Sequence, residues 1–323
     1  MYDSRKQILD MKKKRKFYRG AVNHVYQRTI DGVQLFYCIE DCLVFYTIFA
    51  VCAKNDEVVP LELCLMHNHT HALIQCETVH ELSRFVDHYT SWYVQEYNSF
   101  IGRRGKLFKK NFGSAPKWDD KRLRSAIIYI GNNPVEKNFC GSARDYRWNF
   151  LAYKDNASPF SEKLVKRNSS YELQKALKEV DSMVSLNLPI KYRQLIRMTR
   201  KLNENEFEQL VDYIITAYLP FDYNSLSSHF KSYDSMLLAM DSTTGDDYDI
   251  KESRDGFSIM SFREMRTYFL RRMPMYEIRK VTALSLEDKM VLYKELLENT
   301  SATGKQICNF LHIHAEKDSP DLG

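Results

Sequence analysis

Residues 65–74 read Leu65-Met66-His67-Asn68-His69-Thr70-His71-Ala72-Leu73-Ile74, and histidine recurs at every second position of a stretch that is otherwise typical of a β-strand. Successive side chains of a strand point to opposite faces, so we expect His67, His69 and His71 to share one face. Two imidazoles about 7 Å apart on a rigid strand can hold a divalent cation when a third ligand comes from another element. The alternative is a polar stripe on a half-exposed strand, because His-x-His also occurs without a metal.

A second candidate segment lies downstream, at residues 119–134. It opens on acidic side chains, carries apolar side chains at i, i+4 and i+7, and ends at Pro134, which predicts an amphipathic helix that the proline closes. Tyr129 and Asn133 are four residues apart and share a face of this helix. An amide oxygen is a suitable ligand for Mg²⁺ or Mn²⁺, and a phenol beside it is a candidate nucleophile for a metal-bound phosphate. The alternative for Tyr129 is an ordinary core tyrosine.

Together with other segments in a fixed order, these residues resemble the REP-associated tyrosine transposases. This family belongs to the single-tyrosine HUH transposases, whose relatives among the insertion-sequence transposases act on single-stranded DNA. Its metal-binding strand reads Met-Pro-Asn-His-hydrophobic-His. The resemblance extends over roughly residues 15–155, and the matching segments are residues 23–28 with 35–36, 66–74, 97–98 with 105–108, 129–130 with 133–135, and 145–148.

The resemblance implies a role for each matching residue. His69 and His71 stand at the two histidines of the HUH pair and would bind the metal. Asn133 stands where the family supplies a third ligand, and Tyr129 stands at the nucleophilic tyrosine. His67 occupies a position that is usually proline, so it is not implied as a ligand.

Two residues depart from the family pattern. Thr70 replaces the bulky hydrophobic residue between the two histidines, and its hydroxyl needs a partner on the other face of the sheet. Asn111 stands near a place where many relatives carry arginine, which concerns a DNA phosphate contact rather than the chemistry.

The function that the resemblance implies is a metal-dependent DNA transposase or endonuclease. It would cleave and rejoin single-stranded DNA at hairpin-containing sites through a 5′-phosphotyrosine intermediate, with Mg²⁺ or Mn²⁺ as cofactor. One alternative is a catalytically decayed or domesticated regulator that only binds DNA. Another is a replication or mobilisation nickase, but such relatives often carry further tyrosines on the nucleophile helix or a helicase module, and no GxxxxGK[ST] motif is present.

The distribution of charge suits a DNA partner. Residues 1–160 hold 24 lysines and arginines against 17 aspartates and glutamates, whereas the rest of the chain holds 23 against 25. A positive surplus in the half with the candidate site favours an anionic polymer, here single-stranded or hairpin DNA. Two basic clusters flanked by phenylalanine and tyrosine are candidates for stacking on unpaired bases, although a solvated basic face is the alternative. The candidate DNA-binding residues are Lys12, Lys13, Lys14, Arg15, Lys16 and Arg19 in the first cluster, and Arg103, Arg104, Lys106, Lys109 and Lys110 in the second.

Composition limits the class of protein. The 323 residues contain no apolar run of the length that a membrane span needs, and the apolar residues 44–53 are better interpreted as a buried helix. Seven cysteines without a CxxC pair indicate reduced thiols. We therefore expect a cytoplasmic protein that does not bind membranes. The resemblance further implies a nucleoid-associated protein of prokaryotic type that is a monomer or a homodimer.

The expected fold is α+β. Residues 1–157 should form the HUH domain, a ferredoxin-like antiparallel sheet with helices, and residues 158–323 a mostly helical accessory domain with a helix-turn-helix outline near 285–313. In the first domain we expect strands at 18–28, 58–64 and 65–76, and helices at 39–54 and 78–99 in addition to the Tyr129 helix. In the second we expect helices at 172–186, 204–218, 262–270 and 285–298, and a loop at 242–247.

Overall fold

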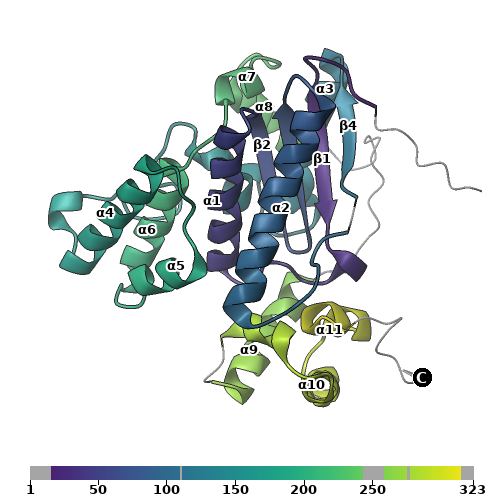
Figure 1. The fold of residues 1–323 in the computed structure, drawn as a ribbon, viewed down its shortest axis with the longest axis vertical. Coiled ribbons are helices and arrows are strands. Elements are labelled where there is room, and N and C mark those ends of the chain that lie inside the picture. Colours follow the sequence, from purple (N-terminus) through teal and green to yellow (C-terminus); the bar gives the residue numbers. More distant parts are fainter. Residues whose placement is uncertain (1–15, 110, 243–257, 275–276, 314–323) are drawn as a thin grey trace, which may run out of the picture.

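One antiparallel sheet organises the first half of the molecule. The computed structural model describes residues 16–109, 111–242, 258–274 and 277–313. Its four strands, in the order β2-β3-β1-β4, are β1 (Val22–Arg28), β2 (Val59–Met66), β3 (His69–Gln75) and β4 (Gly113–Lys117). Helices α1 (Ile39–Asn55) and α2 (Val79–Ile101) cover one face, and α3 (Asp120–Glu136) covers the other (Figure 1). This βαββαβ order is the ferredoxin-like arrangement, so the expected α+β fold is confirmed.

The hairpin between β2 and β3 corrects the expected strand boundary. β2 continues to Met66, and His67 and Asn68 form the two-residue turn that leads into β3. Backbone N–H groups of Leu35 and Phe36 donate to the His67 carbonyl at 2.7 Å and 3.3 Å, so the adjoining segment fixes this turn. His67 therefore lies in a turn and not on a strand as expected, although its ring remains 6.0 Å from that of His69.

Two further expectations about this half are wrong. Pro134 does not close α3, which continues to Glu136, because a proline near the C-terminal end removes only one N–H donor from the helix. Strand β4 was not expected, since its sequence contains both glycine and proline. It pairs only with β1 at the sheet edge, where Pro116 is tolerated, and a Cβ at Gly113 would lie 1.8 Å from Cζ of Tyr26.

Helix α1 is the centre of the larger core. Its residues 41–53 are all buried, as expected for the apolar stretch, because α2 and the sheet cover one side and later helices cover the other. These later helices are α4 (Tyr171–Ser185), α5 (Tyr192–Thr199) and α6 (Glu204–Ala217), seen beside α1 in Figure 1. The Tyr46 hydroxyl donates to the Ile215 carbonyl at 2.8 Å across this contact.

The remaining helices form two other groups. Helices α7 (Tyr223–Ser227) and α8 (Tyr233–Ser242) pack on β2 and α3, where Gly131 allows the Met240 side chain to approach closely. Helices α9 (Ile259–Arg272), α10 (Leu286–Asn299) and α11 (Gly304–Leu311) surround a core of their own (Figure 1). Four short 3-10 turns, η2 (Ala143–Asp145), η3 (Arg147–Asn149), η4 (Leu151–Tyr153) and η5 (Lys166–Asn168), connect α3 to α4.

The helical second half matches the expectation in type and position. The expected helices at 172–186, 204–218, 262–270 and 285–298 correspond to α4, α6, α9 and α10, and Ser285 caps α10 by accepting from the Asp288 N–H. Residues 243–247 of the expected loop lie outside the described residues. The domain boundary at 157/158 and the helix-turn-helix assignment for α10 and α11 stay predictions. Among the described helices, none combines the length and the apolar character that crossing a membrane requires.

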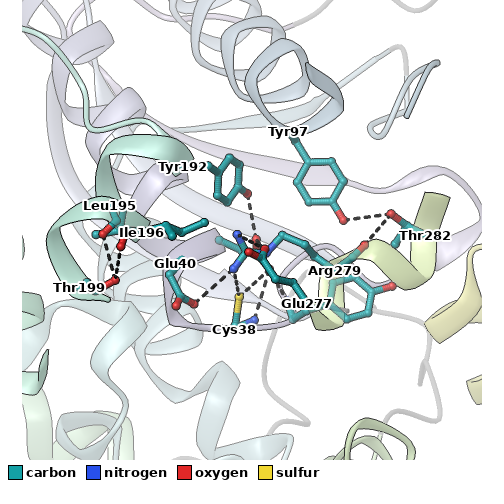
Figure 2. Close-up of polar contacts among 12 residues, drawn as sticks. Cys38, Glu40, Tyr97, Tyr192, Leu195, Ile196, Thr199, Glu277, Arg279 and Thr282 are labelled. Carbon is teal, nitrogen blue, oxygen red and sulfur yellow. Dashed lines mark hydrogen bonds and ion pairs between the residues drawn. The ribbon is translucent and has the colours of Figure 1, made fainter. Parts of the chain in front are cut away.

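A buried charge cluster connects the group of helices α9, α10 and α11 to the start of α1. Arg279, in the 3-10 segment η7 (Ile278–Ala283), is 3% exposed and lies 3.5 Å from a carboxylate oxygen of Glu40 (Figure 2). It lies at the same distance from a carboxylate oxygen of Asp41. The Tyr192 hydroxyl donates to Asp41 at 2.9 Å, and the guanidinium lies 4.9 Å from the centre of the Tyr192 ring. Burial raises the pKa of Asp41 above its ordinary value although Arg279 opposes this.

Candidate active site

Strand β3 places His69 and His71 together beneath α3. Both side chains are 1% exposed, and their ring centroids are 5.0 Å apart. Across the sheet they lie opposite Arg28 and Tyr26 of β1. Alternation along the strand thus brings the two histidines to one buried face, as the sequence pattern requires.

Asn68 fixes the chemical form of His69. Its Nδ2 donates to the Gly32 carbonyl at 3.0 Å, so its Oδ1 is left as the acceptor. This oxygen lies 2.7 Å from Nδ1 of His69, which must then carry the proton. The neutral imidazole presents its lone pair at Nε2, and a hydrogen bond from the other ring nitrogen is the usual support of a metal-binding histidine.

His24 of β1 supports His71 in a similar way. Its Nε2 lies 3.0 Å from Nδ1 of His71, so one ring donates to the other. When Nδ1 of His71 is the donor, Nε2 of that ring is the nitrogen with a lone pair for a cation. No sequence motif indicates a functional role for His24. Alternation along residues 22–28 puts it on the same face as Tyr26 and Arg28, but nothing in the sequence states that β1 pairs with β3.

Tyr129 of α3 lies directly against this pair. Its ring centroid is 5.5 Å from that of His71 and 5.9 Å from that of His24, with edge-to-face orientation in both cases. The side chain is 3% exposed. The structure therefore brings the predicted nucleophile and the predicted histidine pair together within one chain.

Asn133 follows one turn later on α3 and is equally buried. In the described part of the molecule, neither its Oδ1 nor its Nδ2 has a hydrogen-bond partner. An amide without partners in the interior is costly, and a ligand at its oxygen would satisfy it. Over the same residues, no three His, Cys, Asp or Glu side chains are grouped so as to hold a metal ion, so a cation at the histidine pair requires a donor such as this amide.

The predicted DNA-binding residues are only partly described. Lys12 to Arg15 and Lys110 lie outside the described residues, and Lys16 and Arg19 are exposed at the start of the described chain. Arg19 is bonded to Glu77, an exposed pair of little energetic value. Arg104, Lys106 and Lys109 are exposed in the segment that follows α2.

Arg103 differs from its neighbours because it is half-buried. Its guanidinium donates to Oδ1 of Asn98 and to the carbonyls of Gly105 and Lys106, and burial lowers its pKa. These bonds close the turn after α2. The structure thus gives Arg103 a local structural role, while DNA contacts by the basic residues stay predictions.

The two departures from the family pattern have different surroundings. Thr70 is buried on the opposite sheet face from His69 and His71, where its hydroxyl lowers the pKa of Tyr89 of α2 against the larger raising effect of burial. Tyr89 is thus the polar neighbour of the Thr70 hydroxyl. Asn111 is exposed just before β4.

Comparisons with known proteins give little beyond this geometry. No protein-family model and no curated protein matches the chain. One solved structure, that of a REP-associated tyrosine transposase bound to a REP hairpin, is similar over 42% of this chain and 79% of that one, with 12% identity and a TM-score of 0.34. A likeness of this degree assigns no activity to the chain.

Proposed function

We propose that the protein is a metal-dependent transposase or endonuclease that cleaves and rejoins single-stranded DNA, with Tyr129 as the nucleophile. The observation that carries the proposal is the position of the Tyr129 ring, edge-on to His71 and beside the His69–His71 pair. A phenol beside two imidazoles, with a buried and unsatisfied amide one helical turn further along α3, supplies the parts that phosphotyrosine chemistry needs. All of them come from one chain, so the proposed reaction requires no second copy.

The donor set fits a divalent cation. Nε2 of His69, the corresponding nitrogen of His71 and the Asn133 amide oxygen would hold it, as Mg²⁺ or Mn²⁺. When bound, the cation would orient the scissile phosphate and offset the charge that builds on its oxygens. Two nitrogen ligands favour Mn²⁺ over Mg²⁺, since Mg²⁺ prefers oxygen donors.

The reaction at Tyr129 is a transesterification. Its hydroxyl oxygen attacks the phosphorus in line, the bond from phosphorus to the 3′ oxygen of the preceding nucleotide breaks, and a 5′-phosphotyrosine remains. The phenol loses its proton as the new bond forms, and the departing 3′ oxygen takes one up. Attack of a 3′-OH on the phosphotyrosine reverses these steps and joins DNA without ATP, because the ester bond energy is conserved.

Access of DNA requires a movement. His69 and His71 of β3 and Tyr129 and Asn133 of α3 are nearly inaccessible between the sheet and this helix, so a phosphate reaches them only when α3 shifts relative to β1 and β3. This opening would precede binding of the scissile phosphate. Contacts between single-stranded DNA and the basic residues of this half of the chain would supply the free energy for the shift of α3.

The test is the formation of an SDS-resistant protein–DNA adduct. The protein is incubated with labelled single-stranded hairpins from its flanking DNA, with Mg²⁺, with Mn²⁺ and with EDTA. We expect an adduct that needs the metal and is lost in Tyr129→Phe and in His69→Ala. Tyr171→Phe is the matched control, since Tyr171 is exposed on α4 and should leave the adduct unchanged. Hairpin binding without any adduct in both metals would support the non-catalytic regulator instead.

A further inference from the structure

A pocket of about 520 Å³ adjoins the candidate active site but is separate from it. Its walls are the segment around residues 34–42, the end of β2 with His67, the segment around residues 139–148, Phe207 of α6, and the first turns of α9. The volume is within the range of pockets that hold small ligands or single groups of larger ones. The pocket thus lies between the sheet and two of the later helical groups, which contribute α6 and α9 to its walls.

Aromatic side chains dominate the walls. Phe139, Tyr146, Trp148, Phe207 and Phe262 line the pocket and are all half-buried, so part of each ring remains exposed. The Tyr146 hydroxyl donates to the Leu65 carbonyl at 2.6 Å, which fixes that ring in place. Pre-positioned rings with exposed surface are suited to stacking on a flat aromatic ligand.

Two arginines give the pocket a positive edge. Arg263 and Arg266 of α9 line it, are exposed, and form no ion pair with any residue in the described part of the chain. The acidic lining residue Glu40 is already within 3.5 Å of Arg279. Aromatic walls beside guanidinium groups match a nucleotide, whose base stacks while its phosphate accepts from arginine.

The position of the pocket relates it to the histidine pair. His67 lines the pocket, and its ring centroid is 6.0 Å from that of His69. On its other side His67 stacks on Phe139 at 6.1 Å. When a phosphate of single-stranded DNA reaches His69 and His71, the neighbouring nucleotide therefore lies beside the pocket.

We propose that this pocket binds one unpaired base of the single-stranded DNA next to the scissile phosphate, with Arg263 and Arg266 contacting the backbone of that nucleotide. The inference rests on the proposed function, because it assigns a place to a base of the same strand. Helix α9 forms the outer wall of the pocket, so the group of helices α9, α10 and α11 would contact the DNA directly and help to select it. A duplex cannot use the pocket, since its bases are paired and stacked.

The test uses short single-stranded oligonucleotides that carry 2-aminopurine, a base whose fluorescence falls on stacking, and the same strands annealed to complements. All measurements are made in Tyr129→Phe protein with EDTA, so that no chemistry occurs. We expect quenching for the single strands alone, loss of quenching in Trp148→Leu, and about tenfold weaker binding when the base is replaced by an abasic site.

Charge variants on α9 distinguish DNA binding in the pocket from nonspecific electrostatic attraction of DNA to the helix. Arg266→Glu should weaken binding of the single strand about tenfold, whereas Arg271→Glu, the same change at an exposed position of the same helix outside the pocket, should not. Absence of quenching, or equal losses in the two variants, would overturn the inference. If the wild-type protein forms the metal-dependent adduct on Tyr129 but no base-dependent binding is seen in Tyr129→Phe, the inference is overturned and the proposed function stands. Base-dependent binding without an adduct would support the pocket and refute the chemistry.

Discussion

Replacement of Arg279 by methionine tests whether the cluster in Figure 2 holds the α9–α11 group onto the sheet domain. The substitution keeps an unbranched apolar stem but removes the only basic group near Asp41 in the cluster as described. Asp41 is fully buried, and its carboxylate would keep the bonds from Tyr192 and the backbone but lose its counter-charge.

The expected cost is about 3–5 kcal/mol of unfolding free energy, because breaking a buried pair from one side leaves an uncompensated charge. Removing both partners in Asp41→Asn with Arg279→Met should cost less than the sum of the single changes, with a coupling of at least about 1.5 kcal/mol. The loss of unfolding free energy in Arg279→Met, relative to the wild type, should be largest near neutral pH and should become smaller as the pH falls towards about 4. The folded pKa of Asp41 is raised, so acid protonates it in the folded state and the missing arginine then matters less.

The assay is urea unfolding followed by circular dichroism at several pH values. Arg272→Met is the matched control, since Arg272 is exposed on α9 and pairs with Glu295 at 3.5 Å, and we expect a cost below about 1 kcal/mol. Equal costs for the two arginine variants, or additive costs in the double variant, would refute the reasoning about the buried cluster.

Three further outcomes are expected. His24→Ala should lower Mn²⁺ affinity about 10–100-fold, measured by calorimetry, because His71 loses its supporting ring, and unchanged affinity would remove that role. Glu62 is buried without a hydrogen-bond partner among the described residues, and burial raises its pKa well above the ordinary value, so wild-type stability falls as the pH rises above about 4.5. Urea unfolding should therefore show Glu62→Gln gaining on the wild type by about 1.4 kcal/mol per pH unit there, and a constant difference would contradict this. Gly113→Ala should cost about 1–3 kcal/mol through the Tyr26 ring, and a cost of the same size in a Tyr26→Ala background would contradict that cause.

The parts of the fold that the sequence predicted well are those with strong local signals. The apolar run of α1, the cap of α10 and the alternation around His69 and His71 each depend on neighbouring residues, so their expected positions agree with the structure. His67 shows the limit of alternation. The histidine pattern continues through the turn, and only the bonds from Leu35 and Phe36 to its carbonyl show that the strand has ended.

Features that depend on distant residues could not be predicted. Strand β4 has weak propensity and exists because β1 offers it an edge, and the contact between His24 and His71 requires the pairing of β1 with β3. The pocket is a further example, because α9 lines it together with the turn between β2 and β3, which is far from α9 in sequence. Tyr129 and Asn133 were identified through their helical spacing, but their burial against the sheet is a tertiary fact.

The central claim is that Tyr129 forms the covalent link to DNA, and peptide mass spectrometry tests it most directly. Tryptic cleavage after Arg124 and Lys137 releases residues 125–137, in which Tyr129 is the sole tyrosine. After reaction with a single-stranded hairpin and Mn²⁺, followed by nuclease digestion, we predict that this peptide carries the added mass of a 5′-linked nucleotide, and that EDTA abolishes it. A nucleotide on a different peptide, or an unmodified peptide 125–137 alongside demonstrable DNA cleavage, would contradict the account.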